Sequence, residues 1–233
     1  MSLAGRVAIV TGGTGALGQA VTLRLLADGA AVSVPYRTDR EHQALLARLK
    51  PVERDRLLSA RADTTDPTAV TGFVAAVLDR HRRIDVLVAL VGGFASGSLL
   101  ETDRATWDRM LQTNLTSVFT VARAVVPSMV AAGRGRVITV GSRAVVPPAG
   151  GFIAYTVAKS GVIAFTQALA QELRGSGVTA NCVLPSTMDT PANRAAMPDS
   201  DRRGWVPVES VADVIAFLAG DETGHLTGAL LTI

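Results

Sequence analysis

Seven short runs of aliphatic and β-branched residues alternate with longer amphipathic stretches along nearly the whole chain. Several of the short runs are apolar at almost every position, which is typical of parallel strands covered on both faces. Alternating strands and helices favour right-handed βαβ units and a doubly wound sheet. We expect strands at residues 7–11, 31–36, 57–60, 84–91, 136–140, 178–184 and 229–233, and helices near 16–28, 39–49, 67–82, 104–132, 152–174 and 208–219. The pattern predicts an α/β fold with a mostly parallel seven-stranded sheet flanked by helices.

The length and hydrophobicity of the chain favour one folded unit. Its 233 residues are 48% hydrophobic with a mean hydropathy of +0.31, which excludes a disordered chain and suffices for a large core. No linker, repeat or low-complexity tract interrupts the pattern, so we expect a single domain over residues 1–233.

The sequence carries no signal for a membrane or for secretion. No uninterrupted apolar run reaches the roughly 18 residues that a membrane span requires. The segment Met1–Val7 leads directly into the first expected strand and lacks the charged, apolar and cleavage regions of a signal peptide. We therefore expect a cytoplasmic protein.

The charged and metal-binding residue types are scattered. The net charge is only +3 despite a pI of 9.6, and the arginines form no stripe with aromatic residues, so no nucleic-acid partner is expected. No metal site is expected either, because His42, His81 and His225 do not cluster. The single cysteine, Cys182, lies in the apolar run 178–184, where core packing is its expected role.

A glycine-rich turn follows the first expected strand. It reads Thr11-Gly12-Gly13-Thr14-Gly15-Ala16-Leu17-Gly18 and opens the first helix. Glycines in such a turn let the backbone approach a pyrophosphate, while the helix N-terminus offers N–H groups and a positive dipole end. A tight strand–helix connection would look similar, but the position after the first strand favours dinucleotide binding by residues 12–17, and hence a Rossmann fold.

The end of the second expected strand bears on the choice of dinucleotide. An acidic residue there would bind the adenosine ribose of NAD, but the chain reads Tyr36-Arg37-Thr38 and has no carboxylate before Asp39. Arg37 can pair with a 2′-phosphate, so NADP(H) is favoured over NAD(H); a solvated arginine is the alternative. We expect Tyr36, Asp63 and Thr64 to complete the adenosine site, with Asp63 near the adenine amino group.

Tyr155 and Lys159 stand four residues apart in an expected helix, so their side chains lie on one face. A free tyrosine has a pKa near 10, and a fixed cation favours its phenolate, which predicts a lowered pKa and a role in acid–base chemistry. Lysine is rare in this chain: of the 23 basic residues, all but Lys50 and Lys159 are arginines. The spacing alone also occurs on solvated helix faces, so its meaning depends on the surrounding residues.

With these residues the chain resembles the short-chain dehydrogenase/reductase family over essentially its whole length. The resemblance is carried by the glycine-rich turn, Asn114, Ser142 after Val140-Gly141, and the Tyr155/Lys159 pair thirteen residues beyond the serine. It implies that Tyr155 is the general acid and that Ser142 polarises the substrate carbonyl. It also implies that Lys159 binds the nicotinamide ribose and lowers the tyrosine pKa, and that Asn114 holds a water in a proton relay. A loop or capping serine, and a structural hydrogen bond for the asparagine, are the alternatives.

The resemblance implies further cofactor contacts and shows three departures from the family pattern. The implied contacts are Val91, Gly92 and Gly93 after the fourth expected strand, and Pro185, Thr187, Met188 and Thr190 after the sixth. Residues 183–198, with Trp205, are similar to the corresponding segment of quinonoid dihydropteridine reductase, an enzyme that lacks the catalytic serine. Ala16 and Ser186 replace glycines, and Ala89 replaces an asparagine that ties strands together. We expect these changes to affect loop geometry and stability more than chemistry.

Together these residues predict an NADPH-dependent oxidoreductase that transfers a hydride between the nicotinamide and a small carbonyl or alcohol substrate. The alternatives are a dihydropteridine-reductase-like quinonoid reductase and a non-catalytic NADP(H)-binding sensor. A short substrate loop is expected at residues 185–207, and the expected apolar pocket residues, which favour an uncharged substrate, are Phe94, Val145, Val146, Phe152 and Met188. Helices 104–132 and 152–174 carry more apolar surface than one sheet covers, which predicts a homodimer or homotetramer.

Overall fold

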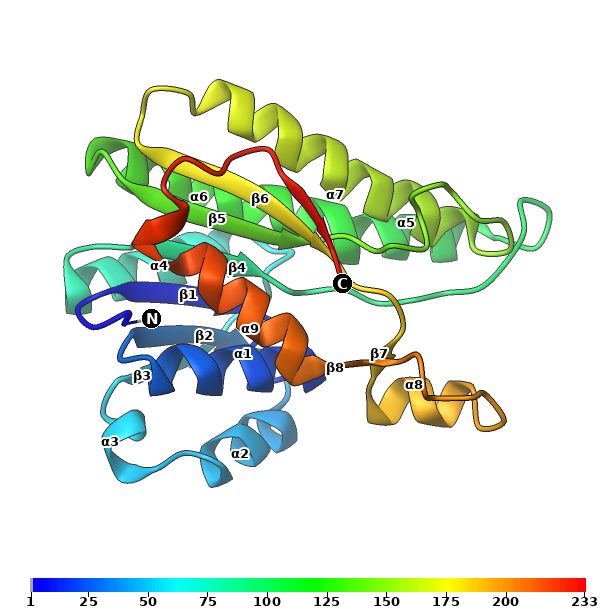
Figure 1. The fold of residues 1–233 in the computed structure, drawn as a ribbon, viewed down its shortest axis with the longest axis horizontal. Helices are drawn as coiled ribbons and strands as arrows, with labels where there is room; N and C mark the ends of the chain where they lie inside the picture. The colour runs from blue at the N-terminus through cyan, green and yellow to red at the C-terminus, as the bar shows by residue number, and fades with distance from the viewer. Residues whose placement is uncertain (1) are drawn as a thin grey trace.

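A seven-stranded sheet forms the centre of the molecule (Figure 1). The computed structural model describes residues 2–233. The strand order is β3-β2-β1-β4-β5-β6-β9, and every neighbouring pair is parallel. The strands are β1 (Val7–Thr11), β2 (Ala31–Tyr36), β3 (Leu57–Arg61), β4 (Val86–Ala89), β5 (Gly135–Val140), β6 (Val178–Leu184) and β9 (Leu230–Thr232). The predicted doubly wound α/β fold is confirmed.

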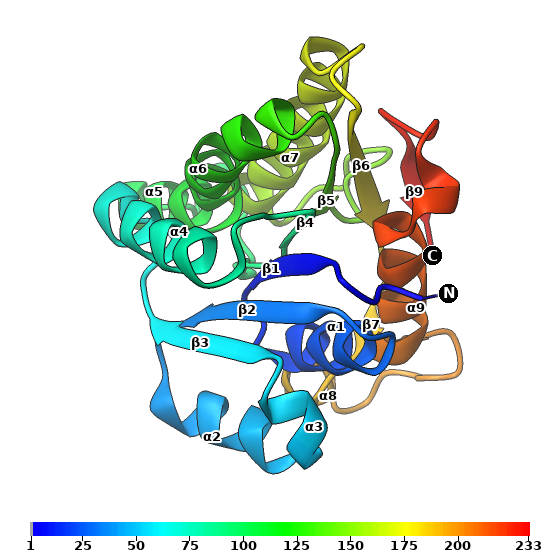
Figure 2. The ribbon, with the colours of Figure 1, turned by 90° about the vertical axis from the view of Figure 1, so that its left-hand side faces the viewer.

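Helices cover both faces of this sheet (Figure 2). One layer holds α4 (Pro67–His81), α5 (Arg104–Leu111), α6 (Ser117–Ala131) and α7 (Ile153–Glu172), and the other holds α1 (Ala16–Ala27) and α9 (Val208–Ala219); α2 (Asp39–Ala47) and α3 (Pro51–Arg54) lie near the β3 edge, and a short 3₁₀ turn spans Asp221–Thr223. Side chains of β1 alternate between the two layers. Val7 and Ile9 belong to the core under α4, α6 and α7, while Ala8 and Val10 belong to the core under α1 and α9.

The structure differs from the sequence prediction where the chain leaves regular geometry. β4 ends at Ala89 rather than at residue 91, and beyond it the Leu90 N–H donates to the Thr11 carbonyl of β1 at 3.1 Å. The helix expected over 104–132 is divided by a π-helical turn at Gln112–Thr116. The expected substrate loop contains α8 (Pro191–Ala196) and a parallel pair of two-residue strands, β7 (Met188–Asp189) and β8 (Val206–Pro207).

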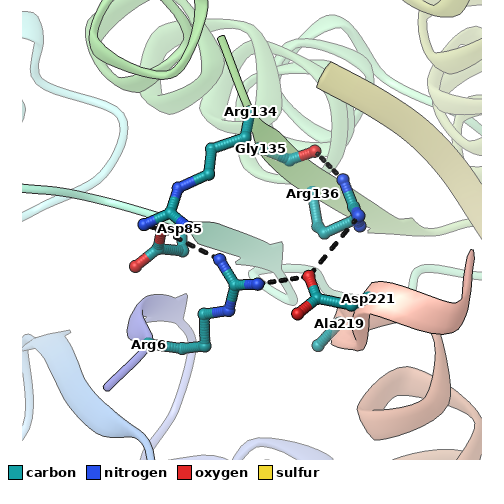
Figure 3. A pocket seen from close by; sticks show the side chains of 7 residues that line it. All are labelled: Arg6, Asp85, Arg134, Gly135, Arg136, Ala219 and Asp221. Atoms are coloured by element: carbon teal, nitrogen blue, oxygen red, sulfur yellow. Dashed lines mark hydrogen bonds and ion pairs between the residues drawn. The ribbon is translucent and has the colours of Figure 1, made fainter. Parts of the chain in front are cut away.

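A cluster of arginine and aspartate side chains joins several elements at the edge where the strands begin (Figure 3). Asp85, which precedes β4, is buried and accepts a hydrogen bond from the Val7 N–H at 2.9 Å. Arg134 lies 3.2 Å from the same carboxylate, and Arg6 bridges Asp85 to Asp221 after α9. The cavity between them is about 20 Å³, no larger than one water molecule. The cluster therefore holds strand starts together and leaves no room for an organic substrate.

Two helices are long and apolar enough to cross a membrane by length and composition alone, Arg104–Ala131 and Ile153–Glu172. In each, 44% of the most apolar window is buried inside the fold. Val121 and Val125 from α6, and Val162 and Ile163 from α7, pack into the same core against the sheet. Both are therefore core helices of this fold.

Candidate active site

The carboxyl ends of four neighbouring strands bring the predicted site residues to one edge of the sheet. β1, β4, β5 and β6 are adjacent and parallel, so the segments that follow them emerge side by side. The strand order reverses between β1 and β4, and in doubly wound sheets ligands bind beside such a switch point. The glycine-rich turn follows β1, Gly92 follows β4, Ser142 follows β5 and Pro185 follows β6.

The glycine-rich turn is packed too closely for side chains. Gly12 has φ +68°, and a Cβ there would lie 3.0 Å from the Val91 nitrogen beyond β4. A Cβ at Gly13 would lie 2.9 Å from the Val34 methyl groups, and one at Gly18 would lie within the backbone of the turn itself. Gly15 is the N-cap residue of α1 and provides no side-chain cap. The turn thus presents bare backbone and a helix N-terminus, which fits the pyrophosphate of a dinucleotide.

At the end of β2, Arg37 and Asp63 form an exposed ion pair. The Arg37 Nη1 lies 3.4 Å from the Asp63 Oδ2, and 66% of the arginine side chain is exposed. The other carboxylate oxygen accepts from the N–H and hydroxyl of Thr65 at 2.9 and 2.8 Å. Burial acts to raise the pKa of Asp63, but the Thr65 bonds and Arg37 outweigh it and hold that pKa below its usual value. The aspartate is therefore ionised and fixed, while the guanidinium stays accessible.

The other predicted adenosine residues are less available. The ring of Tyr36 stacks on His42, with centroids 3.9 Å apart and an interplanar angle of 11°. His42 in turn is hydrogen-bonded to the Ser59 hydroxyl at 2.8 Å. Thr64 is buried. The Tyr36 carbonyl accepts a hydrogen bond from the Ala62 N–H at 3.0 Å, so its ring and its carbonyl both have partners within the fold.

Ser142 and Tyr155 meet beside the end of β5. Ser142 lies two residues beyond the strand, and its Oγ accepts a hydrogen bond from the Ala144 N–H at 3.2 Å. That bond leaves the hydroxyl proton free to be donated. Tyr155 lies in the first turn of α7, where burial raises its pKa and hydrogen bonding with Ser142 lowers it by less. The pKa of Tyr155 therefore lies above its ordinary value of 10.0, and the phenol carries its proton at neutral pH.

Lys159, one helical turn after Tyr155 in α7, is buried, with 8% of its surface exposed. Its Nζ donates a hydrogen bond to the Val140 carbonyl, the last residue of β5, at 2.8 Å. Burial lowers the pKa of Lys159 to about 8, and the nearby Cys182 opposes this shift only in part. The predicted lowering of the tyrosine pKa is wrong for the protein alone, because burial dominates at Tyr155 and the amino group of Lys159 is directed to the strand.

Asn114 reaches the site from the π-helical turn. The residue is fully buried, and its Oδ1 accepts from the Gly93 N–H at 3.1 Å while its Nδ2 donates to the Met110 carbonyl at 3.0 Å. A Cβ at Gly92 would lie 2.9 Å from the Asn114 Oδ1 and 3.3 Å from the Lys159 Nζ. Asn114 and Lys159 therefore converge on Gly92, and the structural hydrogen bond considered for the asparagine is present.

The loop after β6 is ordered by internal hydrogen bonds. The Thr190 hydroxyl caps α8 by accepting from the Asn193 N–H at 3.2 Å, and the Asn193 side chain donates to the Met188 carbonyl at 2.8 Å. The Thr187 carbonyl accepts from the Val206 N–H at 2.8 Å. Pro185 is held against the segment after β5, since its carbonyl accepts from Arg143 N–H at 3.0 Å. The predicted loop contacts thus lie at the same sheet edge, and several of their hydrogen-bonding groups already have partners within the protein.

Sequence reasoning missed one group that the site requires, the Val140 carbonyl. This backbone oxygen holds the Lys159 amino group. Every residue has such an oxygen, so no residue type signals it. The only sequence clue is that Val140 ends the strand two positions before Ser142.

A doubly wound sheet with a glycine turn at its switch point and a serine–tyrosine–lysine set at its carboxyl edge defines a class of nicotinamide-dependent oxidoreductases. A family model described as short chain dehydrogenase matches residues 6–201. The chain therefore belongs to the short-chain dehydrogenase/reductase family and is an NAD(P)-dependent oxidoreductase.

Individual relatives match the chain over its full length. The 3-oxoacyl-[acyl-carrier-protein] reductase FabG of Escherichia coli (strain K12) is 31% identical, covering 100% of this chain and 97% of that protein. The (2S)-[(R)-hydroxy(phenyl)methyl]succinyl-CoA dehydrogenase subunit BbsD of Thauera aromatica is 33% identical, covering 100% and 96%. The crystal structure of a levodione reductase superposes with a TM-score of 0.89 at 25% identity, covering 99% of this chain and 96% of that one.

The burial of Lys159 predicts a pH-dependent stability that a lysine-to-methionine substitution removes. The folded-state pKa of about 8 lies below the ordinary lysine value of 10.5, so the folded state binds fewer protons between these two pH values. Below pH 8 the free-energy cost of burying the charged lysine is therefore at its maximum. This cost decreases as the pH rises toward 10.5. Relative to Lys159→Met, the free energy of unfolding of the wild type should rise by roughly 2 kcal/mol between pH 7.5 and 10.

Urea unfolding followed by tryptophan fluorescence at the two pH values measures this difference. The chain offers a matched control in Lys50, its only other lysine, which is exposed. Lys50→Met should change stability equally at both pH values. Parallel behaviour of the wild type and Lys159→Met would show that the amino group is not held out of water.

Proposed function

We propose that the protein is an NADPH-dependent carbonyl reductase in which Tyr155 acts as the general acid and base. The observation that carries the proposal is the convergence of Ser142, Tyr155 and Lys159 at the sheet edge beside the glycine-rich turn. The names of the relatives support the substrate class, since an oxoacyl group, a hydroxy(phenyl)methyl group and levodione are carbonyl or alcohol compounds. We treat residues 1–233 as one cofactor-binding domain with a substrate loop at 185–207.

The residues present fit the dinucleotide. Backbone at Gly12–Leu17 would hold the pyrophosphate, Tyr36, Asp63 and Thr64 would border the adenosine, and Val91–Gly93 with Pro185, Thr187, Met188 and Thr190 would border the nicotinamide half. Lys159 and Tyr155 would contact the nicotinamide ribose. When bound, NADPH supplies the hydride that the substrate carbon accepts.

The chain's own groups manage the charge that develops on the substrate oxygen. Donated hydrogen bonds from Ser142 and Tyr155 offset the negative charge as it forms, and fixed donors of this kind contribute most when no reorganisation is needed. Because its pKa is raised, Tyr155 holds its proton at neutral pH and can transfer it to the substrate oxygen. Lys159, whose pKa is about 8, titrates closer to neutrality and would return a proton to the phenolate. Asn114 lies beside Lys159 at Gly92, where a water could join the two groups to solvent.

NADP(H) rather than NAD(H) is the proposed cofactor. The support is the exposed guanidinium of Arg37 at the end of β2, where NAD-selective sites have a carboxylate. Its present partner, Asp63, is 3.4 Å away and half-exposed, and such a pair contributes only about 0–1 kcal/mol. A 2′-phosphate with two charges would compete effectively for the same guanidinium.

A homodimer is the proposed minimal assembly, with a tetramer as an extension. Phe119 on α6 and Val157 on α7 are large apolar residues left 47% and 41% exposed on the helical layer. Leu99 and Leu100, before α5, are also exposed. Burial of these side chains against a second copy would remove apolar surface from water. Sedimentation that finds only monomer at micromolar concentration would contradict this assembly.

Replacing the proposed acid should separate chemistry from binding. Tyr155→Phe removes the transferable proton and should lower kcat by about 10²–10⁴-fold, while the Kd for NADPH changes by less than about twofold. The assay follows NADPH absorbance against aldehydes, diketones, quinones and quinonoid pterins. Phe217→Leu, at an exposed position on α9, serves as the control and should leave kcat within about twofold of wild type.

The same panel discriminates between the functional classes. Turnover confined to quinonoid pterins would favour a dihydropteridine-reductase-like activity. Tight NADPH binding with no turnover of any compound would favour a sensor and refute the reductase assignment. A Tyr155→Phe enzyme with undiminished kcat would refute the role of this tyrosine.

Loss of the Arg37 guanidinium should change cofactor preference. Arg37→Ala removes a charge-assisted bond to the 2′-phosphate, and we expect the KM for NADPH to rise at least about tenfold, with little change in the KM for NADH. Arg174→Ala, at an exposed position beyond α7, serves as the control and should affect neither constant. Equal effects of Arg37→Ala on the two cofactors would overturn the NADP(H) preference.

A further inference from the structure

We infer that Phe94 and Phe152 form an aromatic wall beside the Tyr155 phenol, and that the preferred substrates are ketones with an uncharged aromatic ring next to the carbonyl. The inference rests on the proposed reductase function, because it assumes that the reacting carbonyl lies at Tyr155. It names a substrate class for that site.

The three rings form one contiguous group. The Phe94 and Tyr155 centroids are 5.1 Å apart at 67°, Phe94 and Phe152 are 5.8 Å apart at 53°, and Phe152 and Tyr155 are 6.1 Å apart at 70°. All three distances lie in the range where edge-to-face aromatic pairs attract one another. The rings of Phe94 and Phe152 therefore both border the Tyr155 ring.

Phe94 has ring surface that the fold does not cover. It remains 64% exposed although one edge contacts the half-buried Tyr155. An apolar ligand group that covers this ring removes apolar surface from water, which favours binding. A flat ring can cover this surface and add a favourable aromatic pair of about 0.5–1.5 kcal/mol, which a saturated ring of similar size cannot.

The wall is fixed before substrate binds. The Gly97 N–H donates to the Gly151 carbonyl at 2.7 Å, and the Ile153 N–H donates to the Gly97 carbonyl at 3.1 Å. These bonds clip the segment after β4, which carries Phe94, to the segment before α7, which carries Phe152. Gly97 and Gly151 have φ values of +142° and +86°, which residues with side chains rarely adopt. A wall held in place in advance avoids the entropy cost of ordering it around a ligand.

In the part of the chain that the structure describes, no guanidinium covers the rings of the wall. The guanidinium groups that lie over aromatic rings are Arg123 over Phe119 and Arg202 over Trp205, and across residues 2–233 none is placed over Phe94, Phe152 or Tyr155. Val146, after β5, is 47% exposed and likewise apolar. An apolar ring face with no cation over it favours a neutral ring over an anionic substituent. In the reaction, the aryl ketone accepts a hydride from NADPH at its carbonyl carbon and the Tyr155 proton at its oxygen, yielding an aryl carbinol and NADP⁺.

The test compares acetophenone with cyclohexyl methyl ketone, which differ in the aromaticity of one ring. The ratio of their kcat/KM values is measured in the wild type, in Phe94→Leu, which keeps apolar volume but loses the ring, and in Phe217→Leu, which alters an exposed phenylalanine on α9, in the helical layer on the opposite face of the sheet from α7. Intrinsic reactivity cancels when ratios are compared between enzymes. We expect Phe94→Leu to lower the ratio of kcat/KM for acetophenone to kcat/KM for cyclohexyl methyl ketone by about 2- to 10-fold, mainly because the value for acetophenone falls. Phe217→Leu should leave the ratio within about 1.5-fold of wild type.

The outcomes separate this inference from the proposed function. An unchanged ratio in Phe94→Leu overturns the aromatic wall while leaving the reductase intact. Reduction of other carbonyl compounds but of neither ketone also overturns it. Failure of the wild type to reduce any carbonyl compound with NADPH refutes the reductase itself, and the substrate class with it.

Discussion

The burial of a single amino group organises the candidate site. The Lys159 ammonium is held at the end of β5 by the Val140 carbonyl, and burial brings its pKa down to about 8. Asn114, which is bonded to Gly93 and Met110, and the Lys159 amino group both border Gly92 and leave no room there for a Cβ. The site is therefore assembled around the lysine, with the tyrosine one helical turn away.

The parallel sheet makes this assembly possible. Adjacent strands deliver their following loops to one edge, so segments distant in sequence meet without long connections. The packing of Gly12 against Val91 shows how closely the loops after β1 and β4 approach one another. Small residues at these contacts leave bare backbone where a dinucleotide would lie, and Phe94 in the loop after β4 borders Tyr155.

Much of the fold could be predicted from the sequence because strand and helix periodicities are local signals. The doubly wound parallel sheet then follows from general rules for alternating strands and helices, whereas the joint role of Ser142 and Tyr155 is implied by the resemblance to the family. The π-helical turn that aims Asn114 could not be predicted, since it depends on bonds to Gly93 and Met110 that only the folded chain provides. The raised pKa of Tyr155 was also missed, because residue spacing reveals a nearby lysine but not the cost of burying the phenol. Elements as short as α8 and the β7–β8 pair have too few residues for a periodic signal.

The most direct test of the account is to follow the hydride itself. Purified protein is incubated with a carbonyl compound and NADPH deuterated at either face of nicotinamide carbon 4, and the alcohol product is examined by mass spectrometry. The account predicts one deuterium at the carbinol carbon from one of the two labelled faces and none from the other. Tyr155→Phe should slow the appearance of the labelled alcohol. Formation of alcohol without label from either face, or no alcohol from any carbonyl compound, would contradict the assignment of the site.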